Sequence, residues 1–114
     1  MAWFFSKALT LEPSEEKLVL LWTVLEIFPM KDTTDIRPIS EYLSPIVGQP
    51  PDVVKETLSI GRLCGIRSEL VHHGILPIAK DDMGELFGQL ENICVEVMRA
   101  LSNLPYRGTL TSYF

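Results

Sequence analysis

The sequence has few features that would suggest export, membrane insertion or bulk binding to nucleic acid. Its 114 residues include only two cysteines, and ten Lys and Arg stand against fifteen Asp and Glu, for a formal net charge of −5. No apolar run reaches the roughly 18–20 residues that a membrane span needs. Residues 1–13 lack the basic leader and apolar core of a signal peptide. We therefore expect a cytoplasmic protein that does not enter a membrane or coat nucleic acid.

Other absences narrow the chemistry. Cys64 and Cys94 have no C-x-x-C spacing and lie among apolar residues, so we expect reduced core residues and no disulfide. The two histidines, His72 and His73, are adjacent and would point to different sides of a helix, which argues against a metal site. No Gly-rich phosphate loop or nucleophile elbow is present. We expect no metal and no other cofactor.

The sequence does have helical patterning. With 46% hydrophobic and 22% charged residues, it is typical of one globular domain over 1–114, with a core at about 14–104. Start and stop signals predict helices over about 14–28, 36–48, 51–73 and 81–104. Ser14, one of Thr33, Thr34 or Asp35, and Asp81 or Asp82 are the candidate caps. The prediction is an all-α fold, an antiparallel bundle of about four helices.

Two of these helices have distinctive surfaces. The first is apolar on nearly all sides and should be the most buried, so the carboxylate of Glu26 within it needs a partner or a shifted pKa. The last has a regular apolar stripe that ends with Leu101 and Leu104, and its charged residues should face outward: Glu85, Glu91, Glu96 and Arg99.

Two glycines in the predicted third helix need an explanation, because each costs about 1 kcal/mol relative to alanine. Gly61 and Gly65 are four residues apart, which would let another backbone approach closely. The sequence favours a tight crossing with the first helix or with a second copy of the third, and a local break in the helix is the alternative. We expect the N-terminal aromatics Trp3, Phe4 and Phe5 to pack on the domain or on a partner subunit. The C-terminal residues 105–114 show no helix pattern.

The stretch "IRSELVHHG", residues 66–74, holds the candidate chemistry. An arginine that is always charged and a histidine that titrates near neutral pH suit phosphodiester chemistry: His72 can move a proton and Arg67 can hold the phosphate. On a straight helix the two lie about 140° apart, so they converge only if the helix loosens or two chains share the site. From spacing alone, a positive helix end favoured by the macrodipole is the simpler interpretation for Arg67, His72 and His73. Ser68 has no accompanying catalytic elements.

"LWTVLEIFP" in the first helix, followed some 40 residues later by "IGRLCGIRSELVHHG", resembles the HEPN superfamily, in particular its Apea-like branch. The resemblance covers roughly residues 17–101, and residues 66–72 match the signature in order. His73 stands where the family usually has its first glycine, and Gly74 fills the second. The resemblance implies an all-α bundle, commonly dimeric, in which the Arg and His of two subunits face each other. It also implies that Glu26 pairs with Arg67, with Ser68 as the polar residue that follows the arginine.

Many members of that family are metal-independent endoribonucleases of toxin–antitoxin or phage-defence systems, and others are inactive interaction or nucleotide-binding modules. The leading hypothesis is therefore a HEPN-like homodimer that binds RNA and cleaves it with Arg67 and His72, supported by Glu26, Ser68 and His73. Its partners would be RNA or a nucleotide, and an antitoxin or other protein. The first alternative is an inactive module of the same fold. The second is an unrelated helical protein.

Overall fold

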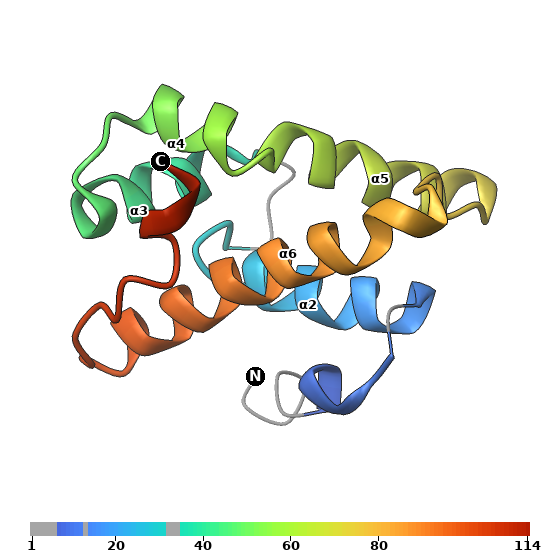
Figure 1. Ribbon diagram of the computed structural model, residues 1–114, viewed down its shortest axis with the longest axis horizontal. Coiled ribbons are helices and arrows are strands. Elements are labelled where there is room, and N and C mark those ends of the chain that lie inside the picture. Colours follow the sequence, from blue (N-terminus) through green and yellow to red (C-terminus); the bar gives the residue numbers. More distant parts are fainter. Residues whose placement is uncertain (1–6, 13, 32–34) are drawn as a thin grey trace.

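The computed structural model describes residues 7–12, 14–31 and 35–114, and this part of the chain is helical, with no strand. Residues 7–10 form a short helical segment. The elements that follow are α2 (Glu15–Ile27), α3 (Arg37–Val47), α4 (Pro51–Thr57), α5 (Ile60–His73), α6 (Lys80–Leu101) and the 3₁₀ helix η1 (Thr111–Tyr113) (Figure 1). The all-α prediction is confirmed, but the helices are more numerous than the four expected. Trp3, Phe4, Phe5, Thr33 and Thr34 lie outside the described residues.

Local signals set several helix ends where the sequence predicts them. The Ser14 hydroxyl accepts a hydrogen bond from the Lys17 amide at 3.3 Å, and acidic residues follow in the first turn of α2. α2 ends at the extended residue Phe28. Gly48 and Gly74, in the left-handed region at φ 74° and 67°, end α3 and α5.

The predicted third helix is wrong in one respect, because two helices, α4 and α5, replace it. Between them Ser59 has φ 55° and ψ 37°, a left-handed conformation that cannot continue a right-handed helix. The chain therefore changes direction before it reaches Gly61. The alternative of a local break is the correct one, although a serine forms it and not the glycines.

The expected tight crossing of Gly61 and Gly65 on the first helix is also wrong. A Cβ built at Gly65 would meet nothing within 4 Å, and one at Gly61 would meet only the Lys55 Cε at 3.8 Å. α5 contacts α2 through another of its sides. Within the described residues, nothing packs on the glycines closely enough to offset their cost.

α6 differs from its prediction at both ends. Ala79 is the N-cap, so Asp81 and Asp82 are first-turn residues that favour the helix dipole and are not caps. Leu101 and Leu104 are exposed, since the core ends about one turn earlier, at Val97. The middle part of the apolar stripe of α6 is buried as predicted: Leu86, Phe87, Leu90, Ile93, Cys94 and Val97.

The helices do not form a simple antiparallel bundle. α2 and α6 lie side by side and run in the same direction, whereas α5 runs opposite to both (Figure 1). A buried cation joins α2 to α6: Lys17 is 6% exposed, its Nζ forms an ion pair with Glu91 and donates a hydrogen bond to the Leu11 carbonyl at 3.0 Å. Because a buried charge is costly without partners, this lysine fixes the packing of α2 on α6.

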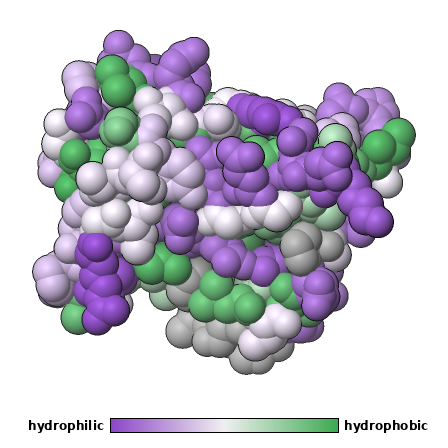
Figure 2. All heavy atoms as spheres, in the orientation of Figure 1, coloured by the Kyte–Doolittle hydropathy of each residue, from purple (hydrophilic) through white to green (hydrophobic). Residues whose placement is uncertain are grey.

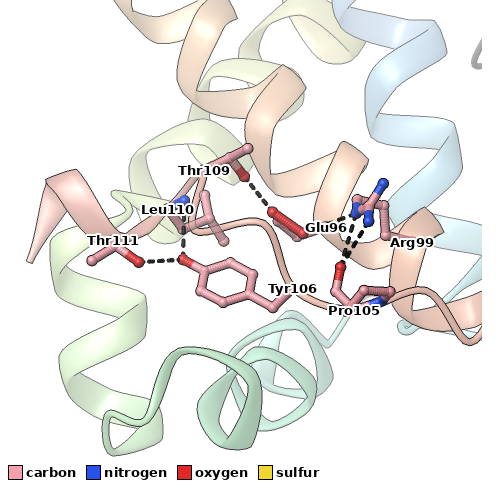
Figure 3. A network of polar contacts seen from close by, with 7 residues as sticks. All are labelled: Glu96, Arg99, Pro105, Tyr106, Thr109, Leu110 and Thr111. Atoms are coloured by element: carbon pink, nitrogen blue, oxygen red, sulfur yellow. Dashed lines mark hydrogen bonds and ion pairs between the residues drawn. The ribbon is translucent and has the colours of Figure 1, made fainter.

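The C-terminal segment folds back over α6, and it buries a carboxylate that the sequence predicted to be outside. Glu96 is 1% exposed, and its Oε2 accepts a hydrogen bond from the Thr109 hydroxyl at 2.5 Å (Figure 3). Arg99 donates to the Pro105 carbonyl from two nitrogens, at 2.9 and 3.1 Å. The neighbouring Leu110 is fully buried, so this segment belongs to the core.

Replacing Thr109 by valine should destabilise the fold, because it leaves the buried Oε2 of Glu96 without its donor. Loss of a partner to a buried carboxylate costs about 1–3 kcal/mol. Urea unfolding of Thr109→Val measures the effect. Thr111→Val is the matched control, since the Thr111 hydroxyl contacts the Tyr106 hydroxyl at an exposed site. Equal midpoints for the two variants would contradict the burial of this contact.

Candidate functional site

The Arg67–Glu26 pair predicted by the family resemblance is present. Arg67 lies on the side of α5 that faces α2, and its Nη2 is 3.3 Å from Glu26 Oε1 and 3.5 Å from Oε2. Each side chain is 33% exposed, so Glu26 is less buried than its apolar neighbours suggested. Within the described residues, the other guanidinium nitrogens donate no hydrogen bond. Glu26 therefore orients the guanidinium and leaves part of it open to an anion.

His72 lies on another side of α5. It is exposed in the last turn of the helix, and it makes no hydrogen bond or ion pair with the described part of the chain. α5 is a continuous helix from Ile60 to His73. A step of five residues on such a helix separates Arg67 from His72 by about 140° in direction and about 7.5 Å along the axis. One chain alone therefore does not aim both side chains at one small target.

The other two candidate residues on α5 are His73 and Ser68. The His73 Nε2 lies 3.9 Å from Glu69 Oε2, one turn earlier, and both side chains are more than half exposed. His73 is still helical, and the chain turns only at Gly74, whose amide bonds the Leu70 carbonyl at 2.9 Å. The bulk of His73 thus does not disturb the turn. Ser68 is half-buried and forms no hydrogen bond through its hydroxyl with the described residues.

The surface between Arg67 and His72 is partly apolar, which sequence reasoning missed. Counted from Arg67, Val71 projects about 40° and Ser68 about 100° around the helix, both inside the 140° sector that ends at His72. Val71 is 54% exposed. It lines a shallow groove of about 410 Å³ between α5 and α2, with the other walls formed by Glu15, Glu16, Val19, Leu20 and Leu70. The sequence did contain one indication of this apolar surface, the pair Leu70 and Val71 within an otherwise polar stretch.

Figure 2 shows this mixture on the surface: apolar side chains emerge among hydrophilic ones at the end of the molecule where α5 leads into the loop to α6. Val71 and Ile75, which is 60% exposed, belong to that end. A patch of this kind is a common feature of interfaces between proteins.

Cys94 is not reactive, and the described residues do not form a metal site. Cys94 is fully buried, its Sγ donates to the Leu21 carbonyl at 3.3 Å, and burial raises the pKa of its thiol far above the usual value, so it is not a nucleophile. Cys64 is half-buried, and both thiols are free. Among the described residues, no group of three His, Cys, Asp or Glu side chains could hold a metal ion. None of the helices in that part of the chain has the length and apolar character needed to cross a membrane.

No family model, curated protein or solved structure that was compared with this chain gives a significant match.

Replacing Glu26 by glutamine should lower the free energy of unfolding by about 0.5 kcal/mol, since the pair is partly exposed and screened by water. The difference from the unmodified protein should shrink in about 1 M salt, where charges are screened within about 3 Å. Urea unfolding at low and high salt measures both effects. Glu85→Gln is the control, because Glu85 is exposed on α6 and has no ion pair with the described residues. If Glu26→Gln and Glu85→Gln change the free energy of unfolding equally at both salt concentrations, Glu26 does not orient Arg67 through an ion pair.

Proposed function

We propose that this protein is a HEPN-like, metal-independent endoribonuclease that acts as a homodimer. The observation that carries the proposal is the Arg67–Glu26 pair, which holds a guanidinium at the surface of α2 and α5. Five residues further along, the exposed imidazole of His72 has no partner among the described residues. A preoriented cation can stabilise the charge on a phosphate and an imidazole can transfer a proton, so these two residues supply groups that phosphodiester cleavage uses.

In the proposed reaction, the ribose 2′-oxygen forms a bond to phosphorus and the bond from phosphorus to the 5′-oxygen breaks. His72 takes the 2′-hydroxyl proton as a neutral imidazole, or delivers a proton to the 5′-oxygen as an imidazolium. Arg67 hydrogen-bonds the nonbridging oxygens and stabilises the charge that develops on them. The products are a 2′,3′-cyclic phosphate and a 5′-hydroxyl, and no metal takes part.

A second copy of the chain completes the site. Because Arg67 and His72 diverge within one helix, a partner can contact both only by packing on the sector between them, where Ser68 and Val71 lie. Val71 supplies an exposed apolar contact there, and the adjoining groove reaches Val19 on α2. In a two-fold dimer packed on this sector, the arginine of each chain meets the histidine of the other.

The charge distribution is consistent with contact at a seam and not with coating of RNA. The net charge of the chain is −5, while residues 53–80 carry four cations and two carboxylates. Few phosphates can be neutralised by so small an excess, so affinity for RNA should be modest and should depend only weakly on salt.

A specific observation also favours the alternative, an inactive HEPN-type interaction or nucleotide-binding module. Glu26 already neutralises Arg67, and a phosphate must compete with that carboxylate for the guanidinium. In such a module the same surface binds a partner protein, such as an antitoxin, or a nucleotide, without cleavage.

Incubation of the purified protein with structured and unstructured RNA in EDTA tests the proposal. Cleavage should leave 2′,3′-cyclic ends, and Arg67→Ala and His72→Ala should each slow it by about 100-fold or more. Arg62→Ala is the matched control, because this arginine is exposed on α5 outside the sector between Arg67 and His72. No cleavage, or equal cleavage in all variants, would rule out this mechanism and favour the inactive module.

A mixture of the two inactive variants tests whether the site is shared. A dimer of one Arg67→Ala chain and one His72→Ala chain keeps one intact arginine–histidine combination. Random mixing should therefore restore about a quarter of the original activity. Recovery of none would place both residues of each site in the same chain.

Replacing Val71 by glutamate should convert the dimer to a monomer and abolish cleavage, because it places an unpaired carboxylate in the apolar part of the seam. Sedimentation at about micromolar concentration measures the oligomeric state. Val53→Glu is the matched control, since Val53 is a 39% exposed valine on α4. A monomeric unmodified protein, or a Val71→Glu variant that remains dimeric, would exclude this seam.

A further inference from the structure

The shallow groove between α2 and α5 is an apolar surface that the described residues leave uncovered. Its volume is about 410 Å³, and most of its wall is apolar. Val19 on α2 and Val71 on α5 both line it, and they are 43% and 54% exposed. Because apolar side chains favour contact with other apolar groups over water, an apolar occupant would be stabilised in this groove.

The described part of the chain begins beside this groove. The Lys7 Nζ lies 3.2 Å from Oε1 of Glu16, and Glu16 forms part of the groove wall. The residues that follow are fixed in place, since Ala8 is fully buried and the Leu11 carbonyl accepts a hydrogen bond from Lys17 at 3.0 Å. The residues before Lys7 therefore start from a fixed point that one ion pair connects to the groove wall.

The sequence before Lys7 contains three consecutive aromatic residues, Trp3, Phe4 and Phe5. In an extended segment, residues 3 and 5 project to the same side and lie about 7 Å apart. The reach of an extended chain from Lys7 is about 7 Å to Phe5 and about 13 Å to Trp3. Both aromatic side chains are therefore within reach of the groove.

The length and the charge of the groove match this segment. Its wall on α2 extends from Glu15 to Leu20, five positions that cover about 7.5 Å along the helix axis. Two aromatic rings about 7 Å apart can therefore lie one behind the other. Residues 1–6 carry no acidic side chain, so they add no carboxylate to the end of the groove where Glu15 and Glu16 lie.

From these observations we propose that residues 3–5 dock in the groove between α2 and α5 of their own chain. Trp3 and Phe5 lie against the exposed valines of the two walls, and Phe4 projects away from the groove. His72 does not line the groove, so this docking is independent of RNA cleavage.

Methyl NMR of the full chain tests the docking, because a methyl group that lies against the face of an aromatic ring is shifted upfield. The methyl resonances of Val19 and Val71 should be shifted upfield in the unmodified protein and should move downfield in the double variant Trp3→Ala/Phe5→Ala. Phe4→Ala is the matched control and should move neither. Equal valine shifts in the unmodified protein and the double variant would overturn the proposal.

Mixing of chains separates docking within one chain from docking on a second copy. Isotopically labelled Trp3→Ala/Phe5→Ala protein is combined with an excess of unlabelled, unmodified protein. Docking within one chain leaves the labelled valine resonances at their downfield positions, because the labelled chains have no rings of their own. A return of these resonances upfield would assign the rings to a second copy and overturn docking in the same chain.

Quenching of tryptophan fluorescence by acrylamide is a second measurement. The chain has two tryptophans, and Trp22 is 2% exposed, so the quencher reports on Trp3. Val19→Glu should raise the quenching at least about threefold, because a carboxylate in the groove opposes burial of an apolar ring. Val19 is chosen because Val71 also belongs to the proposed seam between two copies. Val53→Glu, at a 39% exposed valine on α4, is the matched control. Equal quenching in the two variants would show that Trp3 does not occupy the groove.

Discussion

Each residue of an α-helix turns the next side chain by about 100°, and in α5 this rule fixes the directions in which Arg67 and His72 project. The helix is continuous from Ile60 to His73, so Arg67 points toward α2 and His72 points to solvent. On an ideal helix these two directions differ by about 140°. The two proposed catalytic groups therefore lie on the two sides of a sector, and the residues within that sector determine which partner could contact both. Val71 makes the sector apolar, which suits a protein surface better than a nucleic acid.

The contacts that hold α2 in place leave the Arg67–Glu26 pair free for another role. α2 packs on α6 through a fully buried apolar face and through the Lys17–Glu91 pair, where the cation is nearly inaccessible to water. The Arg67–Glu26 pair is partly exposed and longer than an optimal charged hydrogen bond. The core contacts of α2 therefore do not involve the exposed Arg67–Glu26 pair, and loss of that pair would leave them in place.

The sequence predicted those parts of the fold that depend on neighbouring residues. Ser14, Gly48 and Gly74 act within one turn of their own positions, so the helix ends that they form could be predicted. Ser59 could not, because a serine adopts the left-handed region only when packing on both sides requires it. The burial of Glu96 depends on residues 105–111, a segment without periodicity, and no local pattern indicates such a contact. The Arg67–Glu26 contact joins residues 41 positions apart, and only the family resemblance pointed to it.

The open space beside Gly65 and the single contact at Gly61 have a consequence for the stability of α5. These residues lie in the first half of α5, just after the break at Ser59, and no side chain from the described residues covers them closely. Glycine lowers the free energy needed to open a helical turn, so the first half of α5 depends on the burial of Ile60 and Leu63, each 1% exposed, to stay closed. The corner between α4 and α5 is therefore held by apolar packing and not by the helix propensity of its residues.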